Sequence, residues 1–353
     1  MKANNPFTLT FGRQPGKYIE RFEASENIIS TFMSENPISQ TYLISGIRGS
    51  GKTVLMTSIV KELVATGDWI SVDLNSAVDL LDDFSKRLGD ACKKGSGLSE
   101  GGIDISVAGF GVGISGSRVE KDSVSKIESL LEFAKKKNKK VVVTIDEVTA
   151  NSSMRIFASQ FQIFIRKELP VYLIMTGLYE NIFAIQNDPK LTFLLRSPKI
   201  ILEPLSIHQI VSQYKEIFDL DLETATKFAA LTKGYAFAFQ AFGLLYWEHR
   251  DELSFEKIIS KFDDLLDDFV YKKIWEGLSA IDKKIVGALV QNNREKVSDV
   301  REKLSLTSAN FAKYRERLIN KGVVSATEHG VIELSLPRFG KVAQTYIEYE
   351  LLG

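Results

Sequence analysis

The chain has 353 residues, of which 44% are hydrophobic and 25% charged, which is ordinary for a globular protein of roughly two or three domains. Its 45 basic and 45 acidic residues cancel, so binding to nucleic acid or to a membrane surface would need a local patch of charge. The single cysteine excludes an intramolecular disulfide, the three histidines are scattered, and no segment reads as a signal peptide or a membrane span, so we expect a cytoplasmic protein without a metal cluster.

Strands and helices are predicted to alternate from Thr41 to about Leu205. Short apolar runs, each bounded by polar residues, occupy residues 41–45, 69–74, 140–146, 171–177 and 199–205. Their hydrophobicity is continuous rather than alternating, which is typical of parallel strands that are covered on both faces. We therefore predict an α/β core over residues 1–205, built on a parallel five-stranded sheet.

Residues 102–115 interrupt this alternation. Their apolar side chains alternate and then shift phase around Ala108 and Gly109, which predicts an inserted β-hairpin. The segment contains Asp104 and no basic residue. A glycine-rich ornament or a subunit contact is therefore favoured over an arm that holds DNA.

The C-terminal half contains two further patterns. Residues 206–277 have only helical patterns, which predict a small helical domain. After residue 278 the sequence predicts helices at 280–291, 297–304 and 309–321, followed by a glycine stop and a hairpin. Three helices and a hairpin in this order indicate a winged helix-turn-helix domain over residues 278–353.

A phosphate-binding motif follows the first strand. Gly46-x-x-x-x-Gly51-Lys52-Thr53 stands between an apolar strand and an amphipathic helix, as a Walker A loop requires. Backbone N–H groups and the helix N-terminus would surround the phosphates of ATP, Lys52 would supply charge, and Thr53 would bind Mg²⁺. The residues expected to bind the nucleotide from this loop are Gly46, Arg48, Gly49, Ser50, Gly51, Lys52 and Thr53.

A second motif, VVVTIDEV, ends in two carboxylates. Asp146 at the end of its strand is expected to bind Mg²⁺, and Glu147 to orient or deprotonate the attacking water. A base for water favours an ATPase over a small-molecule kinase, which must exclude water. On the next strand, Thr176 would either sense the γ-phosphate or be an ordinary buried threonine whose hydroxyl bonds to the backbone.

Arg196 stands a few residues before the fifth predicted strand. From this position it could reach the γ-phosphate of a neighbouring subunit as an arginine finger. The alternative is a surface arginine in a local ion pair.

The order of motifs resembles a known group of ATPases. A FGRQP box, GIRGSGKT, VTIDE, MTG, RSPKIILEPLS, TKGYAFAFQAFG and a winged helix follow one another along nearly the whole chain. This order is similar to the AAA+/STAND-type P-loop ATPases, in particular the archaeal-ATPase-like group related to initiator and origin-recognition ATPases. The resemblance implies a P-loop NTPase core, a helical lid over residues 206–277 and nucleotide held between core and lid, with Arg13 and Pro15 near the adenine.

The lid departs from the pattern of both related groups. Initiator ATPases typically carry a lid arginine after Gly-Asp-Ala, and STAND proteins typically have Gly-x-Pro, whereas this chain has Gly234-Tyr235-Ala236-Phe237. The missing lid arginine implies weak or slow coupling between nucleotide state and lid position.

The predicted recognition helix has an inward and an outward face. Phe311, Tyr314 and Leu318 form the inward stripe, and the outward residues expected to contact DNA are Asn310, Lys313 and Arg317. The wing tip is not basic, and winged helices also bind proteins. We therefore expect an ATP-dependent switch that forms homo-oligomers on double-stranded DNA, with a signalling ATPase that binds a protein partner as the alternative.

Overall fold

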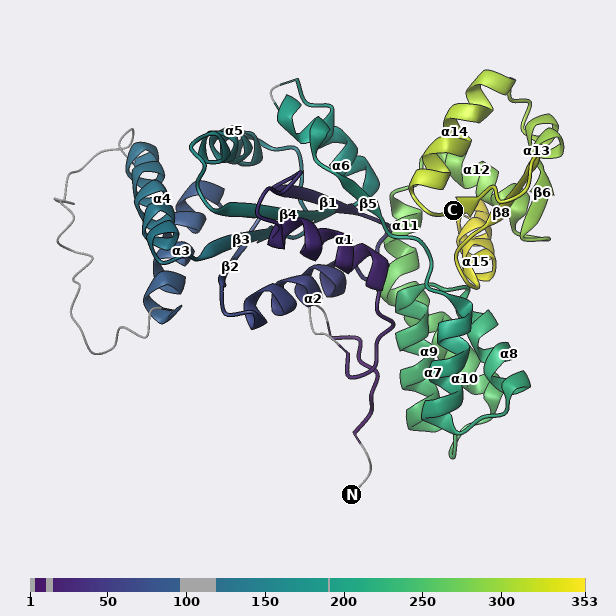
Figure 1. Cartoon of the computed structure of the whole chain (residues 1–353). Coiled ribbons are helices and arrows are strands. Elements are labelled where there is room, and N and C mark those ends of the chain that lie inside the picture. The colour runs from purple at the N-terminus through teal and green to yellow at the C-terminus, as the bar shows by residue number, and fades with distance from the viewer. Residues whose placement is uncertain (1–3, 11–14, 96–118, 190, 353) are drawn as a thin grey trace. The chain divides into compact units, whose positions relative to one another are not determined.

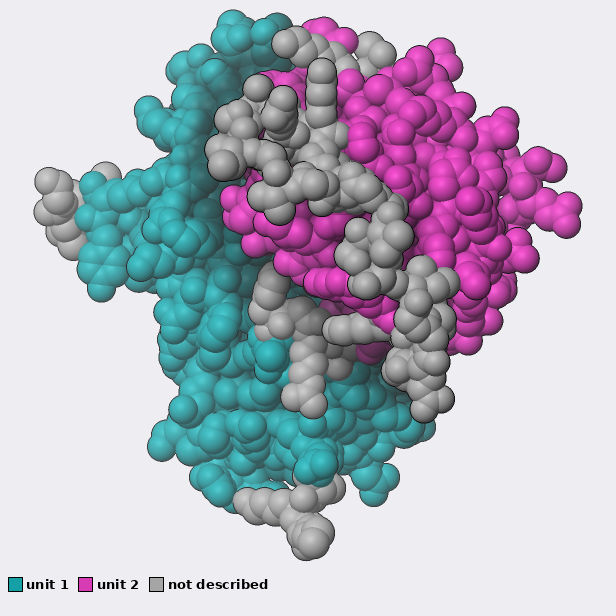
Figure 2. All heavy atoms as spheres, turned by 90° about the vertical axis from the view of Figure 1, so that its left-hand side faces the viewer, with its two compact units in different colours: residues 1–21, 46–51, 202–353 teal, residues 22–45, 52–201 magenta. Residues whose placement is uncertain are grey.

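The computed structural model describes residues 4–10, 15–95, 119–189 and 191–352. The predicted hairpin at 102–115 and Arg13 therefore lie outside the described residues. The chain divides into two compact units, shown in teal and magenta in Figure 2. Unit 1 contains residues 1–21, 46–51 and 202–353, and unit 2 contains residues 22–45 and 52–201.

Unit 2 contains the predicted parallel sheet. Its strands are β1 (Thr41–Ser45), β2 (Trp69–Leu74), β3 (Lys140–Ile145), β4 (Val171–Gly177) and β5 (Lys199–Ile201), in the order β2-β3-β4-β1-β5. All four neighbouring pairs are parallel, which confirms the predicted five-stranded parallel sheet. The fifth strand ends at Ile201 instead of residue 205, and Pro204 in the remaining segment has no N–H to donate to a neighbouring strand.

Helices cover both faces of this sheet (Figure 1). They are α1 (Phe22–Met33), α2 (Lys52–Ala65), α3 (Leu80–Gly95), α4 (Val119–Lys136), α5 (Ser152–Arg166), α6 (Tyr179–Gln186) and the short 3₁₀ helix η2 (Thr192–Arg196). On the α1 face, Phe32 contacts the rings of Tyr42 and Tyr172, and on the opposite face Leu43 and Leu173 belong to the hydrophobic cluster of α3–α6. Burial on both faces explains the continuous hydrophobicity of the strands.

The first helices of unit 1 lie in the region that the sequence predicted to be a lid, and they are called the lid helices here. They are α7 (Ile207–Phe218), α8 (Leu222–Thr232), α9 (Ala236–His249), α10 (Phe255–Leu266), the π-helical turn η3 (Asp267–Tyr271) and α11 (Lys272–Glu276). Aromatic rings fill their centre, where Tyr214 contacts Phe218, Phe239 and Phe242. Phe7 from the N-terminal segment stacks on Phe218, so residues far apart in sequence share this core.

The C-terminal part of unit 1 has the predicted helices and hairpin. They are α12 (Ala280–Leu289), α13 (Val297–Lys303), α14 (Ser308–Asn320), β7 (Val324–Ser325) and β8 (Val331–Leu334). Two further elements were not predicted: β6 (Arg294–Lys296), which completes an antiparallel sheet in the order β6-β8-β7, and the last helix, α15 (Phe339–Leu352). Phe311 and Leu318 of α14 are buried, as expected for an inward stripe.

The last helix connects the C-terminal part to the lid helices. Tyr346 of α15 donates a hydrogen bond to Asp267, and the indole N–H of Trp275 donates to Glu350 at 3.0 Å. Just before α15, Arg338 forms a bidentate ion pair with the buried Asp263 of α10. The lid helices and the C-terminal helices also share one hydrophobic cluster, which explains why they form one compact unit.

Among the described residues, no helix combines the length and the apolar character that crossing a membrane would require.

Candidate nucleotide-binding site

The Walker A loop connects β1 to α2 through a tight turn. Ser50 donates its backbone N–H to the carbonyl of Ile47 at 3.2 Å, which closes the turn. Gly49 and Gly51 have φ angles of +73° and +92°, in the region that glycine enters at little cost, so the turn depends on both glycines. α2 begins at Lys52, immediately after the second of them.

The predicted Mg²⁺ ligands lie together in unit 2. β3 ends at Ile145, and the next residue, Asp146, accepts a hydrogen bond from the hydroxyl of Thr53 on α2 at 2.7 Å. The structure therefore brings together the hydroxyl and the carboxylate that the sequence assigned to one metal ion. Both groups offer oxygen atoms, the ligand type that Mg²⁺ prefers.

Thr176 completes this group from the neighbouring strand. Ile145 is paired with Met175 in the β3–β4 ladder, so Asp146 lies beside Thr176. The Thr176 side chain is fully buried, and its hydroxyl donates a hydrogen bond to the Asp146 carboxylate. The same hydroxyl also accepts a hydrogen bond from the backbone N–H of Glu147 at 3.4 Å, so it contacts both the backbone and the carboxylate of the proposed metal site. A role for Thr176 in sensing the γ-phosphate stays a prediction.

Glu147 has an unusual backbone conformation. Its φ is +51°, which is uncommon for a residue with a side chain and costs free energy that the surroundings must supply. Its N–H donates to the Asp146 carboxylate at 3.0 Å, and the next N–H, from Val148, donates to the carbonyl of Thr176 at 2.9 Å. These bonds hold the turn and leave the Glu147 side chain exposed, without a hydrogen-bond partner among the described residues.

The loop residues also suit a phosphate ligand. Ser50 has a buried hydroxyl with no hydrogen-bond partner among the described residues, so a polar ligand at the loop would satisfy it. A Cβ on Gly46 would lie 2.6 Å from this hydroxyl, so a side chain there would displace it. The residues present therefore fit a nucleotide at the loop, and the Thr53–Asp146 pair fits Mg²⁺.

Four residues outside the motif contact the loop within unit 1. Arg21 donates to the carbonyl of Ser50 at 3.1 Å, and the Tyr235 hydroxyl donates to the carbonyl of Arg48 at 2.5 Å. The N–H of Phe237 donates to the carbonyl of Gly49 at 3.0 Å, and Gly322 packs against Ile47 so closely that a Cβ would lie 1.9 Å from its methyl group. The sequence did not predict these contacts. Three of them end on backbone carbonyls, which every residue has, and the fourth depends on a glycine that has no side chain, so neither kind leaves a pattern in the sequence.

Arg196 ends the helix η2, and its side chain is exposed. Within the part of the chain that the structure describes, it takes part in no ion pair or hydrogen bond. The local ion pair that was the alternative to an arginine finger is therefore absent among these residues. Its action on a second subunit stays a prediction.

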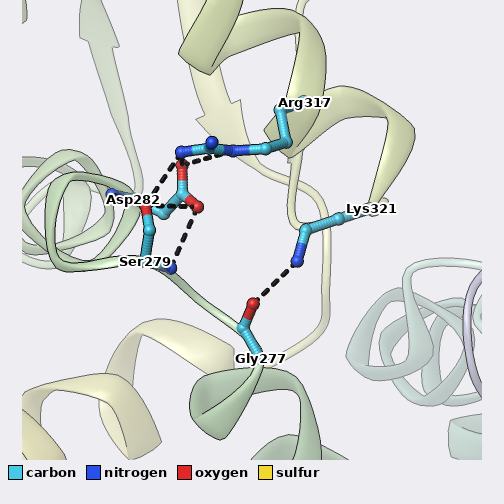
Figure 3. Close-up of polar contacts among 5 residues, drawn as sticks. All are labelled: Gly277, Ser279, Asp282, Arg317 and Lys321. Atoms are coloured by element: carbon cyan, nitrogen blue, oxygen red, sulfur yellow. Dashed lines mark hydrogen bonds and ion pairs between the residues drawn. The ribbon is translucent and has the colours of Figure 1, made fainter. Parts of the chain in front are cut away.

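The outward residues of α14 differ from one another in their surroundings. Asn310 and Lys313 are exposed, but Arg317 donates to Asp282 Oδ1 at 2.6 Å and to the hydroxyl of Ser279 at 2.8 Å (Figure 3). Asp282 is only 1% exposed. The predicted role of Arg317 as a DNA contact therefore needs revision, because its guanidinium already compensates a buried carboxylate.

Comparisons with known proteins found two matching family models. Residues 42–177 match the model of the ATPase family associated with various cellular activities (AAA), and residues 268–341 match a domain of unknown function (DUF8462). No curated relative matches the sequence.

Two solved structures share the fold over almost the whole chain. The Walker-type ATPase PABY2304 of Pyrococcus abyssi superposes with a TM-score of 0.66 at 14% identity, over 96% of this chain and 99% of that one. The ORC2 protein of Aeropyrum pernix, solved as ADPNP–ADP complexes, gives a TM-score of 0.61 at 13% identity, over 95% of this chain and 96% of that one. Residues 42–177 therefore form an ATPase domain that matches the AAA family, and the chain as a whole shares the fold of these two structures.

Proposed function

We propose that the chain is a molecular switch that binds and hydrolyses ATP and, in its ATP-bound form, assembles on double-stranded DNA through residues 278–353. The observation that carries the ATP part is the Thr53–Asp146–Thr176 group, in which two hydroxyls converge on one carboxylate at the carboxyl edge of the sheet. In support, the similar ORC2 protein of Aeropyrum pernix was solved with ADPNP and ADP.

Each site residue has a distinct task in this proposal. Lys52 and the loop N–H groups bind the phosphates of ATP, and Thr53 and Asp146 hold Mg²⁺, which neutralises charge on the phosphate oxygens. Thr176 keeps the Asp146 carboxylate oriented through its hydrogen bond. Glu147 accepts the proton of the attacking water, a role that its exposed and unpartnered carboxylate allows.

The DNA part of the proposal rests on residues 278–353. Their order of helix, strand, two helices and a hairpin supports a winged helix-turn-helix assignment, in which α14 is the recognition helix. Asn310 and Lys313 are exposed on α14.

Few phosphate contacts per subunit imply that single subunits bind DNA weakly. Each neutralised phosphate contributes only about −0.9 to the slope of log affinity against log salt. Useful affinity therefore requires several subunits on one duplex, each raising the effective concentration of the next. Nucleotide-dependent homo-oligomers would provide this, with Arg196 of one subunit near the phosphates of its neighbour.

The Arg317–Asp282 pair favours a second candidate, a signalling ATPase whose C-terminal part binds a protein. In that pair, Arg317, one of the three predicted DNA contacts, already has an anionic partner within the protein. At the hairpin, Glu328 neutralises the charge of Arg294 in the same way. A winged helix with so few unpaired cations on its outward face is better suited to a protein surface than to phosphates.

Titration of a fluorescent duplex with the protein in ATP, in ADP and without nucleotide distinguishes the two candidates. We expect tighter binding in ATP and, for Lys313→Ala, a salt slope smaller by about 1 per subunit. Lys284→Ala removes an exposed lysine from α12 and serves as the matched control, with wild-type affinity expected. No duplex binding in ATP by a protein that hydrolyses ATP would exclude DNA and leave the protein partner.

A further inference from the structure

The lid helix α9 lacks the usual polar side chain at its N-terminus. Its N-cap residue is Tyr235, which makes no side-chain capping bond, so the first N–H groups of the helix need other acceptors. Phe237 donates its N–H to the carbonyl of Gly49 at 3.0 Å. The Walker A loop thus supplies an acceptor that caps the lid helix.

A second bond joins the same two segments. The Tyr235 hydroxyl donates to the carbonyl of Arg48, and the side chain is only 5% exposed. Burial raises the pKa of Tyr235, so the hydroxyl keeps its proton and remains a donor. A Cβ on Gly49 would lie 2.4 Å from this hydroxyl, so the contact also requires glycine in the loop. We call the two bonds, from Tyr235 and Phe237, the loop clamp.

The loop clamp holds two successive carbonyl groups, those of Arg48 and Gly49. All peptide bonds in the described chain are trans and planar. The direction of each of these two carbonyl groups therefore also determines the direction of the N–H of the next residue. Two consecutive peptide planes are therefore oriented by α9. They lie in the turn that leads into Gly51 and Lys52, where the phosphate-binding N–H groups begin.

We propose that Tyr235 is a positioning residue for nucleotide binding, which pre-orders the Walker A loop through the Arg48 carbonyl and joins the lid helix to the loop without a lid arginine. The inference rests on the proposed binding of ATP at this loop. Pre-ordering lowers the entropy lost on binding, so loss of the bond weakens nucleotide binding and leaves the chemical step unchanged. A hydroxyl with a merely structural role would lower the stability of the lid and leave the affinity unchanged.

Tyr214 provides a matched control inside the lid. Its hydroxyl donates to the carbonyl of Phe239 at 2.8 Å, so it also forms a buried tyrosine–carbonyl bond, but one that does not involve the loop. Tyr214→Phe and Tyr235→Phe each remove one hydroxyl and keep the ring. The two variants should therefore lose similar thermal stability and differ in nucleotide binding.

The test measures the dissociation constant of a fluorescent ATP analogue and steady-state ATP hydrolysis. For Tyr235→Phe we expect the dissociation constant and KM to rise about threefold to tenfold, the range that one net hydrogen bond provides, with kcat within about twofold of the wild-type value. For Tyr214→Phe we expect both constants within about twofold of wild type.

Amide hydrogen exchange of residues 46–51 gives a readout that does not depend on turnover. Tyr235→Phe should lower the protection of the nucleotide-free loop, and Tyr214→Phe should not. Wild-type affinity and loop protection in Tyr235→Phe, or equal losses in both variants, would overturn the inference and leave the proposed function intact. Wild-type protein that binds no ATP analogue would refute the proposed function and the inference together.

Discussion

The Arg317 guanidinium donates to Asp282 Oδ1 through two nitrogens, at 2.6 and 3.2 Å, and so joins α14 to the first turn of α12. Asp282 is also the partner of Ser279 in a capping box, in which each side chain bonds the backbone N–H of the other. Lys321 adds a bond from the end of α14 to the carbonyl of Gly277 at 2.7 Å (Figure 3). Arg317 and Lys321 therefore attach α14 to residues 277–282, which include the first turn of α12.

Replacing Arg317 should destabilise the protein. Arg317→Ala leaves the carboxylate of Asp282 buried without its cation, and we expect a loss of about 2–3 kcal/mol. This lies below the loss typical for fully buried pairs because the Arg317 side chain is 41% exposed. Lys313→Ala, on the same helix but exposed, should change the free energy of unfolding by less than about 0.5 kcal/mol.

Chemical denaturation of both variants, followed by circular dichroism, checks this prediction. Equal stability of the two variants would show that the Arg317–Asp282 pair contributes nothing net. Because Arg317→Ala disturbs folding, weaker DNA binding by that variant would not identify a phosphate contact, and Lys313→Ala is the informative change.

Lys52 and Glu147 should affect different steps of the reaction. Lys52→Ala removes the charge that binds the phosphates, so we expect loss of productive ATP binding. Glu147→Gln removes the base but keeps the size of the side chain, so ATP should bind normally while kcat falls about 10²–10⁴-fold. Equilibrium binding and single-turnover hydrolysis separate the two effects. Wild-type turnover in Glu147→Gln would show that the base lies elsewhere.

Arg196 is predicted to act on a neighbouring subunit. Arg196→Ala should retain nucleotide affinity and lose turnover, because the charge that stabilises the transition state would be missing. Mixing Arg196→Ala with Lys52→Ala protein should restore part of the activity, since some subunit junctions then join an intact finger to an intact loop. Arg166→Ala, which removes an exposed arginine from the end of α5, serves as the control and should retain wild-type turnover. Mixed oligomers that show no recovery would contradict action between subunits.

Two glycines with the same backbone conformation should differ in tolerance to alanine. Gly234 and Gly330 have φ angles of +75° and +77°, so alanine at either position costs about 1–2 kcal/mol from the left-handed backbone. A Cβ on Gly234 would also lie 2.6 Å from the carbonyl oxygen of Leu205, whereas nothing lies within 4 Å of one on Gly330. We therefore expect Gly234→Ala to be the more destabilising change.

Thermal unfolding of these two variants measures the difference directly. The additional cost at Gly234 should be about 1–3 kcal/mol, because the nearest atom belongs to the backbone and cannot rotate away. Equal melting temperatures would mean that the 204–205 segment shifts at little cost.

Local patterns in the sequence determined most of the core. The glycine spacing of the Walker A loop, the continuous apolar runs and the carboxylates that follow the third strand depend on neighbours in sequence, because strand burial and turn conformation are local requirements. The same patterns assigned Thr53 and Asp146 to one Mg²⁺ ion and Thr176 to the next strand, since parallel strands present their carboxyl ends at one edge of the sheet. The hydrogen bonds that join these three side chains were seen only in the structure.

Contacts between distant segments were decided only by the tertiary structure. The spacing of Lys313 and Arg317 along one helix could not show that Arg317 faces a buried carboxylate on another, because Asp282 reads as an ordinary capping residue in its own helix. The loop clamp was equally hidden, since Tyr235 and Phe237 bond to backbone carbonyls, which every residue possesses. A partner that is common to all residues leaves no trace in composition or spacing, so only the folded chain shows which carbonyl is used.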